Sequence, residues 1–315
     1  MKCPICNNSK NNSSFFVKEM YIKPQEEFEY IECSKCGCLF IKEIPENISK
    51  YYDINYGPHN HQSSMKNKIL DKIYGLYLAN NKFIKLITRD NVSITSRFWN
   101  SLSEKGIIRK NSSILDVGCG DGKFLSILKK GGFKDLTGMD LFIDEENMLE
   151  GIKIYKSSLE NFKPQRKYDL ITSNHSFEHM DHQLENLKCF ENLVKDDGVI
   201  VIRIPVKTKT VWNKYGVNWV QIDAPRHFFL HTIDSFKILC SKTNLIIDDI
   251  IFDSYDEIFI NCEKYKQNIS PRDSEWNTFK LDDKTTIKLK NEIKELNKKN
   301  QGDRAIFVLR LKNNQ

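Results

Sequence analysis

Short apolar runs alternate with helical stretches from about residue 112 onwards. The runs have the length of strands, and the longer stretches between them have the spacing of helices. The predicted strands are Ile114–Val117, Leu136–Met139, Ile152–Tyr155, Leu170–Ser173 and Val199–Ile204, and the predicted helices are Phe124–Leu128 and Leu184–Leu193. This alternation predicts a parallel sheet with crossover helices.

Further elements follow residue 230. The pattern predicts a helix at Ile233–Cys240, two closing strands at Leu245–Ile251 and Ile306–Leu311, and a charged, solvated helix within Lys280–Asn300. The expected fold class is α/β, with a mostly parallel sheet and an antiparallel closing strand.

The N-terminal part of the chain has another pattern. Residues 1–45 hold five of the nine cysteines and two short β-prone pieces, and they carry too little apolar material for a core of their own. Residues 46–110 are polar, rich in Asn and Lys, and helical in spacing. We therefore predict a small module at 1–45, a helical connector or cap at 46–110 and a main domain at 111–315.

Composition narrows the class of protein. With 315 residues and 40% hydrophobic residues, the chain can bury one α/β core and still form a small module. No apolar run is long enough to span a membrane, and the first residues do not form a secretory signal, so we expect a cytoplasmic protein. A net charge of +6 permits an anionic substrate but does not require nucleic acid.

Two C-x-x-C pairs lie in the N-terminal module. Cys3 and Cys6 form one pair, Cys33 and Cys36 the other, and Gly37 follows as a tight metal-binding turn requires. Four thiolates at this spacing predict a closed, structural zinc site. The alternative is four buried cysteines without a metal; Cys38 is a spare thiol beside the second pair.

The strand at Ile114–Val117 runs into a glycine-rich turn. Gly118, Gly120 and Gly122 let the backbone pass close to a ligand. Asp140 ends the next strand, where its carboxylate can accept hydrogen bonds from ribose hydroxyls. This pattern predicts a nucleotide-type cofactor site, which many doubly wound folds share.

Three segments carry a closer resemblance: LDVGCGDG, SNHSFEHMD after the fourth strand, and Trp219 to His227 after the fifth. Over about residues 95 to 315 the chain resembles class I S-adenosylmethionine-dependent methyltransferases, which are Rossmann-like, and particularly the bacterial ones found with polysaccharide and capsule biosynthesis. The resemblance implies S-adenosylmethionine as cofactor. The residues that it assigns to the cofactor are Asp116, Gly118, Cys119, Gly120, Gly122, Asp140, Ser158, Leu159 and Asn174. The chain departs from the family at Ser157-Ser158, where the family usually places Gly-Asp toward the adenine.

Two histidine clusters follow the fourth and fifth strands, at the ends that face the cofactor crevice. We expect His227 to be a general base, with His175 as the alternative, on a long segment typical of a lid. Arg226 is predicted to clamp a phosphate or carboxylate of the substrate. The alternatives without a functional role are a hydrogen-bonded loop histidine for His175 and a surface salt bridge for Arg226.

The segment from His175 to His179 is also similar to the Glu-x-x-Glu-His site that binds a divalent ion in ubiquinone-pathway O-methyltransferases. Here a histidine replaces the first glutamate. Magnesium prefers oxygen ligands, so we expect no catalytic metal at this segment.

These observations favour an O-methyltransferase that acts on a sugar, a sugar nucleotide or another small precursor of a surface glycan. The substrate class comes from the resemblance alone. The alternatives are an RNA methyltransferase whose zinc module docks the RNA, and a non-catalytic cofactor-binding scaffold. The N-terminal module has scattered lysines and no arginine, which does not favour nucleic acid. The sequence leaves the acceptor atom and the oligomeric state open.

Overall fold

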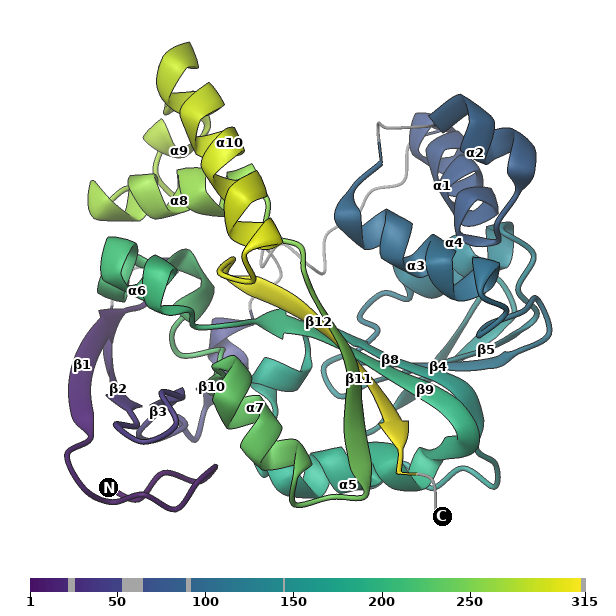
Figure 1. Cartoon of the computed structure of the whole chain (residues 1–315), viewed down its shortest axis with the longest axis horizontal. Coiled ribbons are helices and arrows are strands. Elements are labelled where there is room, and N and C mark those ends of the chain that lie inside the picture. Colours follow the sequence, from purple (N-terminus) through teal and green to yellow (C-terminus); the bar gives the residue numbers. More distant parts are fainter. Residues whose placement is uncertain (22–25, 53–64, 89–91, 144, 313–315) are drawn as a thin grey trace.

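The computed structural model describes residues 1–21, 26–52, 65–88, 92–143 and 145–312. Most of the α/β part is built around one eight-stranded sheet with the order β11-β12-β9-β8-β4-β5-β7-β6 (Figure 1). Its strands are β4 (Ser113–Val117), β5 (Asp135–Asp140), β6 (Asn147–Leu149), β7 (Ile152–Lys156), β8 (Tyr168–Asn174), β9 (Val194–Pro205), β11 (Leu245–Phe252) and β12 (Arg304–Leu311).

The directions of these strands confirm the expected fold class. Strands β7, β5, β4, β8 and β9 run parallel to one another. Strand β12 runs antiparallel between β9 and β11, and the short β6 pairs antiparallel with β7 at the other edge. Because β12 is reversed, its first residue lies beside the carboxyl end of β9, where Arg304 pairs with Pro205.

Both faces of the sheet are covered, which explains why its strands read as continuous apolar runs. Along β9, Val199 and Val201 belong to one buried cluster, whereas Ile200 and Ile202 belong to the other. Helices α1, α3 and α4 supply the first cluster, and α5 and α7 supply part of the second. The helices are α1 (Met65–Leu78), α2 (Lys82–Thr88), α3 (Ile94–Glu104), α4 (Lys123–Lys130), α5 (Gln183–Leu193), α6 (Lys209–Tyr215), α7 (Ile233–Cys240), α8 (Asp256–Lys266), α9 (Glu275–Thr278) and α10 (Asp283–Lys298).

The N-terminal module borrows a strand from the rest of the chain. Its strands β1 (Ser13–Lys18), β2 (Glu27–Glu32) and β3 (Leu39–Ile41) form a four-stranded sheet with β10 (Phe229–Leu230). Two side chains strengthen this junction: the Tyr30 hydroxyl donates to the His227 carbonyl at 2.8 Å, and the Thr232 hydroxyl donates to the Cys36 carbonyl at 2.6 Å. The module therefore shares one buried cluster with the α/β sheet, which supplies the core that its own sequence lacks. The domain limits at residues 45 and 110 stay predictions.

The segment from residue 206 to residue 231 is a packed part of the structure. It contains α6, two short 3₁₀ turns (Gly216–Asn218 and Val220–Ile222) and β10, although its sequence showed no evident element. Trp219 is buried, and its indole N–H donates to Asp303 at 3.1 Å. The segment is thus held between the N-terminal module and the sheet and also lines the main cavity, and its role as a lid or substrate loop stays a prediction.

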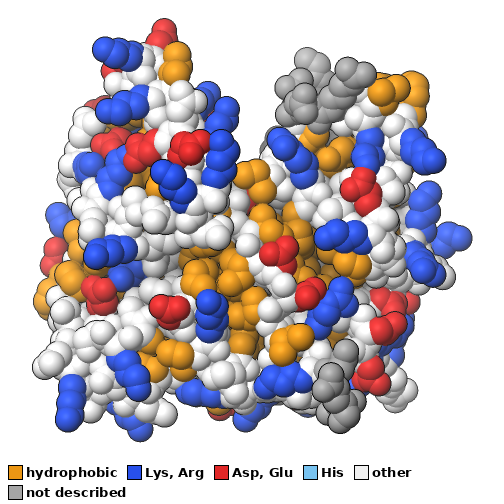
Figure 2. All heavy atoms as spheres, viewed as in Figure 1, with side chains coloured by type: hydrophobic (Ala, Val, Ile, Leu, Met, Phe, Trp, Pro, Cys, Tyr) orange, Lys and Arg blue, Asp and Glu red, His pale blue; other side chains and the backbone are white. Residues whose placement is uncertain are grey.

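Two groups of helices stand on either side of a notch in the surface (Figure 2). Helices α8, α9 and α10 form one side, and α1, α2 and α3 form the other. The sequence pattern predicted α10 but missed α8 and α9. In the part of the chain that the structure describes, no helix combines the length and the apolar character needed to cross a membrane.

Candidate functional site

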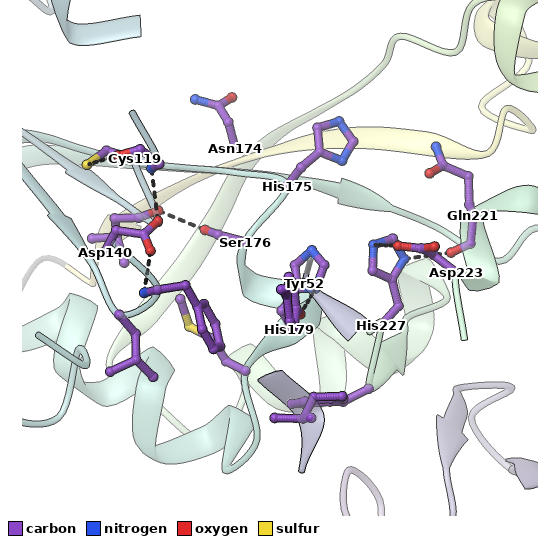
Figure 3. Close-up of a pocket in the computed structure, with 18 of the residues that line it drawn as sticks. Tyr52, Cys119, Asp140, Asn174, His175, Ser176, His179, Gln221, Asp223 and His227 are labelled. Atoms are coloured by element: carbon purple, nitrogen blue, oxygen red, sulfur yellow. Dashed lines mark hydrogen bonds and ion pairs between the residues drawn. The ribbon is translucent and has the colours of Figure 1, made fainter. Parts of the chain in front are cut away.

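A cavity of about 940 Å³ lies at the carboxyl ends of the parallel strands (Figure 3). This volume is within the range of small-molecule and cofactor sites. The structure brings most of the predicted cofactor residues to its wall, namely Asp116, Gly118, Cys119, Gly120, Asp140, Ser158, Leu159 and Asn174. Gly122 does not line the cavity, because it caps helix α4 and packs against Ile154.

The turn between β4 and α4 needs its glycines for two different reasons. Gly118 has a φ of +72°, and a Cβ atom there would lie 2.2 Å from the Cβ of Ser176. Gly120 has a φ of +53°, but a Cβ atom there would meet no protein atom within 4 Å. Both conformations favour glycine. Gly118 allows the close approach of the next loop, while Gly120 leaves open space where a ligand can contact the backbone.

Asp140 ends β5 with its carboxylate fixed at the cavity wall. One oxygen accepts the Gly120 N–H at 2.9 Å, and the other accepts the Phe142 N–H at 2.8 Å. Each carboxylate oxygen has a second lone pair, so both remain able to accept a hydrogen bond from a ligand. The carboxylate is thus oriented by backbone amides before any ligand arrives.

Asp116 lies deeper in the same wall, at the end of β4. Its side chain is buried, and the Thr172 hydroxyl donates to it at 2.6 Å. Burial raises the pKa of Asp116 to about 7, against the opposing hydrogen bond from Thr172. A cationic group in the cavity would favour the ionised form of this acid.

Aromatic residues that the sequence did not single out complete this side of the cavity. The ring of Phe142 stacks on that of Tyr52, with 4.7 Å between the ring centroids and 18° between the ring planes. Phe142 follows Asp140 by two residues, a position from which it could have been inferred. Tyr52 comes from the N-terminal part of the chain, and no local signal in the sequence connects it with the cavity. Both residues line it beside Leu159.

His227 is held in one orientation by its own segment. Its Nδ1–H group donates to the Gln221 carbonyl at 2.7 Å, so in the neutral ring Nε2 carries the lone pair. That Nε2 atom lies 3.9 Å from carboxylate oxygens of Asp223 and Glu178, which is longer than a hydrogen bond. Burial holds the pKa of His227 below its usual range, although the charge of Asp223 opposes this. The ring is therefore neutral at pH 7 and lines the cavity.

His175 reaches the cavity from the end of β8. Its backbone has a φ of +51°, and its Nδ1 lies 3.2 Å from the Glu178 carboxylate. Burial and the positive charges of Arg203 and Arg304 hold the pKa of His175 well below its usual range. Figure 3 shows His175 and His227 on different segments of the cavity wall. The structure thus brings both candidate bases to one site.

Arg226 does not line this cavity, and its position corrects the predicted role in substrate binding. The side chain is fully buried, and its guanidinium donates to Asp223 at 2.6 Å and to Glu19 at 2.9 Å. It also donates to the Tyr51 carbonyl at 3.2 Å. Because its guanidinium is buried and hydrogen-bonded to these groups, Arg226 links the N-terminal region to the segment that carries His227 and does not contact the cavity.

The three side chains that resemble a metal site, those of His175, Glu178 and His179, do not all come together. Ligand atoms of Glu178, His179 and His227 lie within 4.8 Å of one another, whereas His175 is outside this group. The Nδ1 of His179 lies 2.9 Å from both the Tyr52 hydroxyl and the Arg226 carbonyl. That no catalytic metal is held here stays a prediction.

The four paired cysteines of the N-terminal module converge. Their sulfur atoms lie within 4.8 Å of one another, with 3.7 Å between Cys3 and Cys36 and 3.4 Å between Cys6 and Cys33. Tetrahedral Zn–S bonds of about 2.3 Å place sulfur atoms roughly 3.8 Å apart, so the spacing fits a zinc ion. Cys38 is buried nearby but does not belong to this group.

The sheet is mostly parallel, with β12 reversed between β9 and β11, and has the Rossmann-like α/β architecture that the sequence resemblance implied. The chain belongs to the family described as methyltransferase domain, whose model matches residues 87–249, slightly more than half of the chain.

Individual relatives match a smaller part. A malonyl-[acyl-carrier protein] O-methyltransferase of Ilyobacter polytropus is 28% identical over 162 residues, which are 44% of this chain and 58% of that protein. A ubiquinone biosynthesis O-methyltransferase of Rickettsia bellii is 25% identical over 153 residues, 44% of this chain and 62% of that protein. The chain thus spans little more than half the length of these relatives. The crystal structure of a SAM-dependent methyltransferase from Archaeoglobus fulgidus has 20% identity and a TM-score of 0.41, over 67% of this chain and 91% of that one.

Proposed function

We propose that this protein transfers a methyl group from S-adenosylmethionine to a nucleophilic atom of a small acceptor. The observation that carries the proposal is the Asp140 carboxylate, oriented by the amides of Gly120 and Phe142 at the wall of a cavity that the glycine turn keeps open. Membership in the methyltransferase family supports it.

The residues present fit this cofactor. Asp140 would accept the ribose hydroxyls, and the backbone at Gly118 to Gly120 would lie against the methionine part. Ser158, Leu159 and Phe142 would surround the adenine, and the buried Asp116 suits a ligand that carries positive charge. When bound, S-adenosylmethionine supplies a methyl group that its sulfonium has already activated. The protein's remaining task is to align the acceptor and remove its proton.

His227 is the proposed general base. The hydrogen bond from Nδ1–H to Gln221 fixes the tautomer, and the low pKa keeps the ring neutral, so Nε2 can accept the acceptor's proton. The nearby Asp223 carboxylate would stabilise the imidazolium that results. If the acceptor is already ionised, this step is unnecessary and catalysis depends on alignment.

For the acceptor we propose a hydroxyl group of a sugar, a sugar nucleotide or a related precursor of a surface glycan. A base beside the cavity suits a hydroxyl, which carries a proton, and two relatives bear the name of O-methyltransferases. The cavity volume leaves room for a small acceptor beside the cofactor. We propose a small molecule rather than RNA, and a reducing, cytoplasmic setting that suits paired thiolates.

We also propose that Cys3, Cys6, Cys33 and Cys36 hold one structural zinc ion. The convergence of their sulfur atoms supports this, and a four-thiolate site leaves no open position for catalysis. Elemental analysis of protein purified without added metal should give one zinc per chain, and the double variant Cys33→Ser with Cys36→Ser should retain none. A zinc content near zero in the wild type would disprove the site.

The activity is tested in two stages. Calorimetry should first show binding of S-adenosylmethionine and of its product S-adenosylhomocysteine. Tritiated methyl transfer into fractionated small-molecule, glycan and RNA pools should then label the small-molecule pool, with His227→Ala as the inactive control. Label in the RNA pool would replace the acceptor that we propose, and failure to bind either compound would reject the cofactor.

A further inference from the structure

A second pocket of about 520 Å³ adjoins the main cavity. The two share His175, Tyr255 and Arg304 in their walls, so the second pocket opens beside the proposed site of methyl transfer. Ser93, Ile94 and Thr95, at the start of α3, also line this pocket.

Two arginines in this pocket share one carboxylate. Arg203 Nε donates to one oxygen of Asp253 at 2.7 Å, and Arg304 Nε donates to the other at 2.8 Å. The Thr95 hydroxyl also donates to Asp253. Among the residues that the structure describes, no other carboxylate pairs with either arginine. The cluster therefore carries two positive charges and one negative charge.

This excess positive charge is largely removed from water. The side chains of Arg203 and Arg304 are 14% and 6% exposed, and that of Asp253 is 1% exposed. A buried charge without a partner is costly, so such a site is favourable for an anion that enters from the cavity.

Donors remain available for that anion. The remaining described hydrogen bonds of the two guanidinium groups use Nη2: that of Arg203 donates to Thr95 at 3.4 Å, and that of Arg304 donates to the Asp253 carbonyl. Among the described residues, none of these hydrogen bonds uses the Nη1 group of Arg203, whereas the guanidinium of Arg304 also contacts Tyr255, whose ring centroid lies 4.4 Å from the Arg304 Cζ atom. Helix α3 also begins at this pocket, where Ser93 caps its first turn, and the amino end of a helix favours negative charge.

We infer that this second pocket binds an oxyanion, a phosphate or a carboxylate, carried by the methyl acceptor, with Arg203 and Arg304 as its ligands. The inference rests on the proposed methyl transfer, and it gives these two residues the role that the sequence assigned to Arg226. An acceptor held here would lie against His175 and reach into the main cavity. The substrate class is thereby narrowed to acidic molecules, such as a phosphorylated or carboxylated sugar.

The test uses inorganic phosphate and acetate as probes on the 315-residue chain, first without S-adenosylhomocysteine and then saturated with it, at constant ionic strength. Phosphate binding is measured by ³¹P NMR, and acetate by its ability to compete. Arg203→Gln should weaken phosphate binding about tenfold to a hundredfold, since it removes a charge-assisted contact. Arg203→Lys should bind with intermediate affinity, because it keeps the charge but not the planar fork. The matched control is Arg310→Gln, a half-buried arginine further along β12 that pairs with Asp248, and it should bind phosphate as wild type does.

The outcomes are distinct. Equal phosphate affinity in wild type and Arg203→Gln would overturn the inference, provided that both proteins bind S-adenosylhomocysteine in calorimetry and are therefore folded. Phosphate binding that disappears when S-adenosylhomocysteine is added would also overturn it, because the pocket would then hold the cofactor's carboxylate. Failure of the protein to bind S-adenosylhomocysteine at all would reject the proposed function instead, and phosphate binding that depends on Arg203 would still establish the anion site.

Discussion

The two halves of the main cavity are assembled in opposite ways. The half around Asp140, where we propose that the cofactor binds, comes mainly from one stretch of chain, between Asp116 and Leu159, and backbone amides hold the Asp140 carboxylate there. The other half, where we propose that the acceptor binds, joins side chains that are far apart in the sequence, including His175, His227 and Arg304.

Because of this difference, the two halves should tolerate substitutions to different degrees. A site built from backbone groups depends on particular φ angles and on glycines. Such a site suits a cofactor that is the same whatever the acceptor is. Side chains brought together by tertiary packing can change one at a time, so the acceptor half can be adapted to another substrate while the cofactor half stays as it is. If the two halves are independent, a substitution in one should leave the function of the other unchanged.

The largest expected effect is on turnover. His227→Ala should lower turnover by about 10² to 10⁴ while leaving calorimetric affinity for S-adenosylmethionine unchanged, because the residue acts on the acceptor's proton. The exposed His182 offers a matched control, and His182→Ala should keep full turnover. Normal turnover in His227→Ala together with inactive His175→Ala would move the base to the end of β8.

Arg226→Met should destabilise the fold rather than weaken substrate binding. It would leave the buried Glu19 and the adjacent Asp223 without their common partner, which costs about 3 to 5 kcal/mol in urea unfolding. Arg166→Met breaks an exposed pair with Asp135 and should cost less than about 1 kcal/mol. A stable Arg226→Met variant with a raised Michaelis constant for the acceptor would restore the role that the sequence suggested.

The buried Asp116 should make the ligand-free protein sensitive to pH. Its pKa of about 7 in the folded state is above its unfolded value, so between about pH 4 and pH 7 the folded state binds a proton that the unfolded state has lost. Stability therefore falls as the pH rises through this window. The variant Asp116→Asn lacks this titration. Its unfolding free energy minus that of the wild type should therefore increase by up to about 4 kcal/mol between pH 4 and pH 8. If the unfolding free energies of the two proteins change with pH in the same way, burial does not raise the pKa of Asp116.

Asp140→Ala should weaken S-adenosylmethionine binding by about 1.5 to 3 kcal/mol in calorimetry, since it removes charge-assisted hydrogen bonds to the ligand. The matched control is Asp135→Ala, at the other end of the same strand, where the side chain pairs with Arg166 on the surface. Equal affinity in Asp140→Ala and wild type would remove the main support for the cofactor half.

The sequence by itself determined the elements that obey a local rule. Periodic apolar runs predicted the parallel strands, paired cysteines predicted a four-sulfur cluster, and the glycine turn with Asp140 predicted which strand ends line the main cavity. These features succeed because each depends on residues that are neighbours along the chain.

Only the tertiary structure decided which residues form the half of the cavity where we propose that the acceptor binds. Sequence alone could not show that the segment carrying His227 is packed under the N-terminal module, because that packing joins residues such as Glu19 and Arg226, more than 200 positions apart. Nor could it show that the reversal of β12 brings Arg304 beside Arg203 on β9. An arginine next to a histidine in the sequence looked like the anion site, but burial and committed donors gave that arginine a structural role. The excess charge that can attract a substrate arises where two strands from distant parts of the chain meet.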